Sequence, residues 1–162
     1  MGDQRTLVLF NYDWDRLGFG RWAAEFPHDH AGFDLFSFPS NARLPGFDLT
    51  RFVDRLARKA SRAGWQAVTS NHEQFGALAA AMLAERMGWP GTPVNAVLAC
   101  QHKLHARRVM QQVAPEANTG FGLMPARYGE PIPEGIDYPS FVKPVKAAFS
   151  VLARTVRDRE EL

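Results

Sequence analysis

The sequence predicts an α/β protein in which a small, doubly wound, Rossmann-like parallel sheet is followed by a linking helix and a partial antiparallel α+β subdomain. Three observations predict this fold class. Apolar runs of strand length alternate with helix-length amphipathic patterns over residues 1–88. A break rich in proline and glycine at residues 89–93 precedes one more long helical pattern. Beyond residue 114, short strand-like pieces are joined by loops rich in proline and glycine, which is typical of antiparallel pairing.

Three strands are expected in the parallel sheet. Residues 6–10 form a continuous apolar run, as in a strand that is buried on both faces. Residues 33–38 alternate between apolar and polar side chains before Pro39, and residues 66–69 form a third short strand. Because crossovers between parallel strands are right-handed, this order predicts a doubly wound sheet.

Three helices are expected between and after these strands. The first lies at about residues 14–26 and contains two glycines. The second begins after Asp48, a favourable N-cap, and its basic side chains are expected to form a solvated face. The third follows a capping-box spacing at Ser70-Asn-His-Glu73 and ends at Gly88.

The pattern changes after Gly88. Thr92 is expected to cap a helix whose first residue is Pro93 and which runs to about Val113. Strand-like pieces then follow at residues 119–124, 140–144 and 150–156. We therefore predict two domains, which comprise residues 1–91 and 92–162.

Composition excludes several classes of protein. A length of 162 residues with 46% hydrophobic and 22% charged residues is ordinary for a soluble globular chain. A net charge of +2, with basic and acidic residues interspersed, argues against nucleic-acid binding. No apolar run is long enough to span a membrane, and a single cysteine cannot form a disulfide framework. The sequence thus predicts a cytoplasmic protein.

The N-terminal region is unusually aromatic. We expect eight aromatic residues of this region to lie in the core, because aromatic side chains dominate buried area: Tyr12, Trp14, Phe19, Trp22, Phe26, Phe33, Phe36 and Phe38. His28 and His30 are two residues apart in an expected loop, without further ligands nearby in sequence. They are therefore interpreted as surface histidines.

Polar residues follow two of the expected parallel strands. Ligands of such sheets bind at the carboxyl ends of the strands, so these residues are candidates for a site. They are Asn11, Tyr12 and Asp13 after the first strand, and Ser70, Asn71 and His72 after the third. Each also has a simpler role as a turn or capping residue, which we favour.

Two lysines suggest an anion site. Lys143 lies in an expected strand just before Pro144, and lysine is seldom buried without a negative partner. Lys103 lies on the preceding expected helix, on a partly apolar face beside another cation. On residue patterns alone, each lysine is either solvated or a partner for an anion such as phosphate.

The segment Gly88-Trp-Pro-Gly-Thr-Pro-Val-Asn-Ala-Val-Leu-Ala-Cys-Gln-His-Lys103, followed by Tyr138-Pro-Ser-Phe-Val-Lys-Pro144 and Ser150-Val, resembles the entry to an ATP-grasp enzyme. The preceding β-α sheet resembles the pre-ATP-grasp domain of that superfamily. The resemblance covers essentially the whole chain. It implies that Lys103 and Lys143 hold the phosphates of ATP, with the Ser150 hydroxyl in the flap over the triphosphate.

The resemblance also implies a reaction. The γ-phosphoryl group of ATP passes to a substrate carboxylate, and an amine or thiol attacks the resulting acyl phosphate. In the flap at residues 146–150, Ala147, Ala148 and Phe149 stand where the family commonly has glycines. The chain ends at Leu162, where the family continues, so we expect a truncated chain that does not catalyse ligation alone. The Mg²⁺ ligands are expected outside this chain.

Two alternatives from other classes remain. Asp13 and Asp15 after the first strand faintly resemble the nucleophile and second aspartate of haloacid-dehalogenase-type phosphatases. Helix-start carboxylates are the preferred interpretation of both residues. The chain is otherwise a non-catalytic module that binds a nucleotide or a partner protein and self-associates through an exposed sheet edge.

Overall fold

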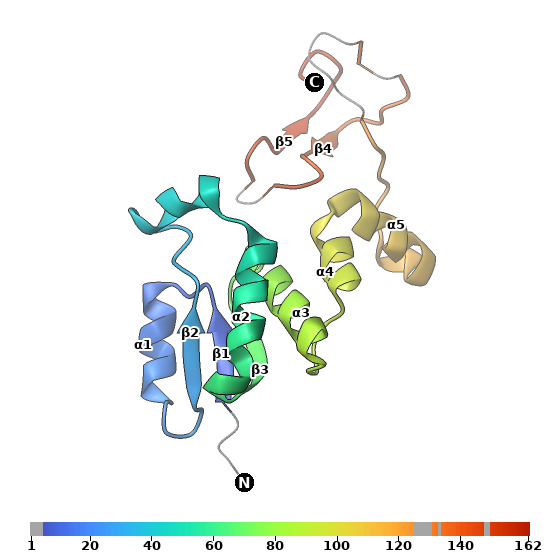
Figure 1. Cartoon of the computed structure of the whole chain (residues 1–162). Coiled ribbons are helices and arrows are strands. Elements are labelled where there is room, and N and C mark those ends of the chain that lie inside the picture. Colours follow the sequence, from blue (N-terminus) through green and yellow to red (C-terminus); the bar gives the residue numbers. More distant parts are fainter. Residues whose placement is uncertain (1–4, 125–130, 133, 148–149) are drawn as a thin grey trace. The chain divides into compact units, whose positions relative to one another are not determined.

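The computed structural model describes residues 5–124, 131–132, 134–147 and 150–162. The chain divides into two compact units, residues 1–98 and 99–162. Figure 1 shows the helices and strands of each unit. The division falls inside a helix, Val94–Gln101, and the domain boundary between residues 91 and 92 stays a prediction.

The first unit is built on a three-stranded parallel sheet. Its strands are β1 (Arg5–Leu9), β2 (His28–Ala31) and β3 (Trp65–Ser70), in the order β2-β1-β3. Leu7 of β1 pairs with Asp29 of β2 and with Val68 of β3. Because β1 has a neighbour on both sides, its apolar run is buried, as the sequence predicts.

Three helices accompany this sheet: α1 (Asp13–Arg21), α2 (Leu49–Ala63) and α3 (Phe75–Met87). The Asp48 carboxylate caps α2 by accepting from the Arg51 N–H, and Gly64 and Gly88 end α2 and α3 in the left-handed conformation. In Figure 1, α1 lies beside β2, whereas α2 and α3 pack against each other and against β3. The core fills the space between the sheet and α2 and α3: Leu7, Leu9, Phe10, Phe33, Leu35, Phe52, Val53, Leu56, Ala79 and Leu83.

The expected strand at residues 33–38 is wrong, because the second strand lies at His28–Ala31. The Asp34 carboxylate accepts hydrogen bonds from the backbone N–H groups of Phe36 and Ser37 and from the Ser37 hydroxyl. These local bonds satisfy donors that a sheet ladder would otherwise use. His28 and His30 are therefore half-buried strand residues rather than surface residues of a loop.

Two helix boundaries also differ from expectation. The first helix ends at Arg21 instead of about residue 26, where the Trp22 N–H turns back to the Phe19 carbonyl. The third helix begins at Phe75, and its first turn is capped by the Nδ1 atom of His72 rather than by Ser70. Ser70 belongs to β3, so its hydroxyl donates to the Leu9 carbonyl of the neighbouring strand.

The expected helix from Pro93 to Val113 is two helices, α4 (Val94–Gln101) and α5 (Lys103–Val113). The chain leaves the helical conformation at His102, whose side chain caps α5 by accepting from the His105 N–H. A short 3₁₀ helix, Pro115–Ala117, follows α5.

The remaining strands of the second unit form an antiparallel pair, β4 (Ser140–Val142) and β5 (Arg154–Val156), with Phe141 opposite Thr155. Both strands are shorter than expected, and residues 119–124 form no strand. Ser150 and Leu152 have φ angles of 56°, which are incompatible with an extended strand. Among the described helices, none is long and apolar enough to cross a membrane.

Candidate functional site

Lys103 is held against the segment that follows β4. It is the first residue of α5, and its backbone N–H donates to the Val145 carbonyl at 3.0 Å. Its Nζ atom donates to the Ala147 carbonyl at 2.7 Å. Both ends of one lysine thus bind carbonyls of the segment after β4, one directly before the expected flap and one inside it. An ammonium group has three donors, and within the described residues one of them is used, which leaves two for an anion.

Lys143 and Ser150 lie in the same unit and are exposed. Lys143 directly follows β4, and its Nζ atom is 5.8 Å from the centroid of the Phe141 ring. In the described part of the chain its ammonium group forms no ion pair. Ser150 accepts a backbone hydrogen bond from Ala153. Two expected flap residues, Ala148 and Phe149, lie outside the described residues.

The described residues offer no group of three or more His, Cys, Asp or Glu side chains that could hold a metal ion. The magnesium expected from the family therefore does not fit the described residues of this chain, and no chemical step is derived through it. The expectation that its ligands lie elsewhere stays a prediction.

The carboxyl ends of β1 and β3 bring together the other predicted candidates. The Asp15 carboxylate accepts from the Tyr12 N–H at 3.1 Å and from the Asn71 side-chain amide at 3.2 Å. It thereby joins the segment after β1 to the segment after β3. Asp13 and Asp15 lie in the first turn of α1, as predicted for helix-start carboxylates.

Asn11 and His30 form a polar pair at the end of β1 and β2. The Asn11 side chain is buried and its amide contacts the Nδ1 atom of His30. Burial lowers the pKa of His30, and the neighbouring His28 and Arg16 lower it further. Within the described residues, the Oδ1 atom of Asn11 has no hydrogen-bond partner.

His72 is buried at the end of β3. Its Nδ1 atom accepts from the N–H groups of Gln74 and Gly76, which requires the proton of the neutral ring to be on Nε2. Burial lowers the pKa of His72, while the nearby Glu73 and Asp34 oppose this effect. The predicted capping role at this strand end is thus confirmed for His72.

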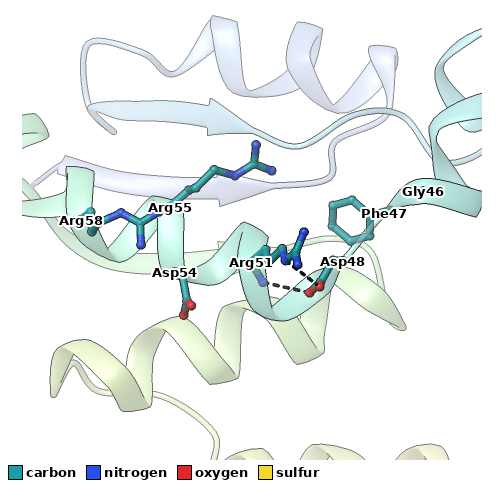
Figure 2. A pocket seen from close by; sticks show the side chains of 7 residues that line it. All are labelled: Gly46, Phe47, Asp48, Arg51, Asp54, Arg55 and Arg58. Carbon is teal, nitrogen blue, oxygen red and sulfur yellow. Dashed lines mark hydrogen bonds and ion pairs between the residues drawn. The ribbon is translucent and has the colours of Figure 1, made fainter.

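A hollow of about 450 Å³ lies along the start of α2 (Figure 2). Arg51, Arg55 and Arg58 line it from one helix face, and Gly46 and Phe47 close one end. Arg51 pairs with Asp48 at 3.4 Å, whereas Asp54 points away from Arg55 and pairs with Arg86. The three arginines belong to the basic face of α2, which the sequence predicts to be solvated.

Comparison with known proteins bears on the fold. No family model matches the chain, and no curated protein matches it. Among solved structures, the L-amino acid ligase from Bacillus licheniformis superposes with a TM-score of 0.73 at 17% sequence identity. The match covers 98% of this chain and 40% of the ligase. The chain has the fold of part of this L-amino acid ligase.

This match confirms the fold class and the resemblance stated from the sequence, at the level of the fold. The chain spans about 40% of the length of the ligase that it matches. Identity of 17% carries the fold and not the function, because one fold hosts many activities.

Proposed function

We propose that the chain contributes phosphate-binding lysines to an ATP-grasp, ATP-dependent ligase that joins a carboxylate to an amine or a thiol. In this proposal, Lys103 and Lys143 bind the phosphates of ATP, and the Ser150 hydroxyl donates to the same group. The site residues lie in the second unit, and ATP is the nucleotide partner.

One observation carries the proposal. The Lys103 N–H and Nζ groups both bind carbonyls of the segment that directly follows Lys143. The helix lysine is therefore fixed beside the chain segment that the family uses as a flap. A second lysine, Lys143, precedes this segment and forms no ion pair among the described residues.

The chemistry that follows is electrostatic. Bound ATP supplies the phosphoryl group that activates the carboxylate. Lysine ammonium groups stabilise the negative charge on the phosphate oxygens, which are otherwise strongly hydrated. Fixing Lys103 through two hydrogen bonds lowers the conformational entropy lost when phosphate binds.

Several parts of the proposal rest on the family alone. The carboxylate and acceptor are unidentified, the metal ligands are expected outside this chain, and this chain by itself is expected not to catalyse ligation. A ligase that uses ATP also fits the cytoplasmic location predicted from the sequence. The rival proposal is a module that binds a nucleotide or protein without catalysis.

The test is titration of the chain with ATP by calorimetry, with and without magnesium. Lys143→Met and Lys103→Met should each weaken binding by roughly tenfold to a hundredfold, the value of one charge-assisted hydrogen bond. Lys59→Met is the matched control, because Lys59 is an exposed lysine on α2 in the other unit. Equal ATP affinity in all three variants would refute the proposal.

A further inference from the structure

Five aromatic rings form a continuous row at the carboxyl ends of the parallel strands. In order, the row is Trp14, Tyr12, Phe36, His72 and Phe75. Successive ring centroids lie 4.6, 5.5, 5.8 and 6.4 Å apart, and all four pairs are stacked. We call these residues the aromatic row.

The row is assembled from the segments that follow all three strands of the sheet. Tyr12 and Trp14 follow β1, Phe36 follows β2, and His72 and Phe75 follow β3. The carboxyl ends of parallel strands are where open α/β sheets bind ligands. The row therefore occupies the part of the first unit where a ligand is most expected.

Much of the row faces solvent, although the sequence predicts that Trp14 and Phe36 are core residues. Trp14 is 66% exposed, Phe36 is 48% exposed and Phe75 is 43% exposed. The core aromatics of the same unit, such as Phe10 and Phe33, are buried. Apolar surface left in water is unfavourable, so a clustered exposed patch indicates a binding surface.

Carboxylates surround the row. Among the residues that the structure describes, Asp15 accepts from two neutral donors, the Tyr12 N–H and the Asn71 amide. Asp34 accepts from the N–H groups of Phe36 and Ser37 and from the Ser37 hydroxyl. Neither aspartate pairs with a cation among the described residues, so both negative charges remain.

The pKa values of two ionisable residues in the row respond to this negative charge. Burial raises the pKa of the Tyr12 hydroxyl, and Asp15, Asp34 and Glu73 raise it further. Asp34 and Glu73 also oppose the lowering of the His72 pKa. The carboxylates that act on Tyr12 and His72 disfavour a negatively charged ligand at the row. The exposed aromatic rings and the carboxylates beside them favour the same ligand chemistry, a positively charged nitrogen.

We infer that the aromatic row binds a small organic cation, whose ammonium group packs against the exposed Trp14 ring at the end of the row, next to Asp15 in the chain. Aromatic rings attract cations through the negative charge on their faces. A neutral apolar ligand would bury the carboxylates without compensating their charge, which is unfavourable. The inference concerns the first unit alone and does not depend on ATP binding in the second.

Tetramethylammonium is the probe, and neopentyl alcohol is its neutral counterpart of similar shape. The full-length chain is titrated with each at constant ionic strength, and the indole N–H resonances are followed by NMR. We expect a saturating shift of the Trp14 resonance with tetramethylammonium, at a Kd about fivefold or more below that of neopentyl alcohol. Trp65 is an internal reference, because its indole N–H donates to Asp29 within the sheet.

Three variants decide the outcome. Trp14→Leu should weaken tetramethylammonium binding about fivefold or more, monitored through the Tyr12 ring protons, and Asp15→Asn should weaken it at least about twofold. Trp22→Leu is the matched control, because Trp22 is 63% exposed and lies outside the row. Equal affinity for the neutral compound, no saturable shift, or equal effects of Trp14→Leu and Trp22→Leu would overturn the inference. Thermal unfolding of each variant checks that the first unit remains folded.

Discussion

Replacing Gly76 with alanine should destabilise the first unit, even though alanine normally favours a helix. A Cβ atom at Gly76 would lie 2.0 Å from the Ser70 hydroxyl oxygen and 2.8 Å from the His72 Cβ atom. Ordinary contact between such atoms requires about 3.5 Å. The Ser70 hydroxyl cannot simply rotate away, because it donates to the Leu9 carbonyl and accepts from the His72 N–H.

The size of the effect follows from three contributions. Overpacking of a tight site costs about 1–3 kcal/mol. Displacing the Ser70 hydroxyl loses up to two hydrogen bonds, each worth about 1 kcal/mol. Replacing glycine in a helix returns at most about 1 kcal/mol. We therefore expect Gly76→Ala to lower the free energy of unfolding by about 2 kcal/mol.

Gly18→Ala is the matched control. Gly18 also lies inside a helix, but a Cβ atom there would have no neighbour within 4 Å. That variant should gain about 0.5–1 kcal/mol. Urea unfolding followed by Trp65 fluorescence reports on β3, which lies next to the altered turn. Equal stability of the two variants would refute the close packing of α3 on β3.

In the double variant Ser70→Ala/Gly76→Ala, the closest contact is removed while the contact with the His72 Cβ atom remains. The double variant should therefore be less destabilised than the sum of the single changes, as expected for residues in direct contact. If the destabilisation of the double variant equalled the sum of the two single effects, the effect of Gly76→Ala would have to arise from contacts other than the one with Ser70.

Three further outcomes are expected. Arg55→Glu should raise the free energy of unfolding by roughly 0.5–1 kcal/mol in a urea titration, because it replaces like-charge contacts with opposite-charge ones along α2; a loss of stability would indicate that the arginines serve another role. The folded-state pKa values of His30 and His72 are lowered, so the unfolded chain binds more protons, and stability present above pH 6.5 should be lost as the pH falls. His72→Asn keeps a capping acceptor but does not titrate, so it should reduce the change in unfolding free energy with pH by at most about 1.4 kcal/mol per pH unit. An unchanged pH dependence would contradict the contribution of His72. Light scattering should show concentration-dependent association through an exposed sheet edge, and a clean monomer at high concentration would exclude it.

The elements that the sequence predicts well are those with local causes. The apolar run of β1 matches its burial, and Asp48 and Gly64 bound α2 as a cap and a left-handed stop. Gly88 ends α3 in the same way. Each of these signals acts within a few residues, so it is visible without knowledge of the tertiary structure.

The second strand was missed because its causes are distant in the sequence. The segment His28–Ala31 has no strand-like apolar pattern, and in the described part of the chain it pairs with β1 alone. The Asp29 carboxylate accepts from Arg5 at 2.7 Å and from the indole of Trp65 at 2.7 Å. These partners lie on the other two strands, and no local window contains them. Residues 33–38 had the better alternation, but the Asp34 side chain satisfied their backbone donors locally.

The sequence predicts only some of the residues that form the aromatic row. The carboxyl ends of β1 and β3 pointed to Tyr12 and His72, but Trp14 and Phe36 were expected in the core. Aromatic composition favours burial in general, and nothing in the sequence distinguishes a ring that faces the sheet from one that faces solvent. That distinction needed the position of Phe36 after β2, which was itself mispredicted.

The break at His102 is the error that matters most for the proposed ATP site. No proline or glycine marks it, so the helical pattern continues through residue 102. In the structure the Lys103 N–H donates to the Val145 carbonyl, whereas in a continuous helix it would donate to the Ala99 carbonyl. The same residue then sends its Nζ atom to Ala147. A continuous helix would leave Lys103 held by its side chain alone. The break therefore adds the backbone hydrogen bond to the side-chain one, so that both ends of this lysine are held on the segment after β4. These partners lie more than 40 residues away and are not visible in the local sequence pattern.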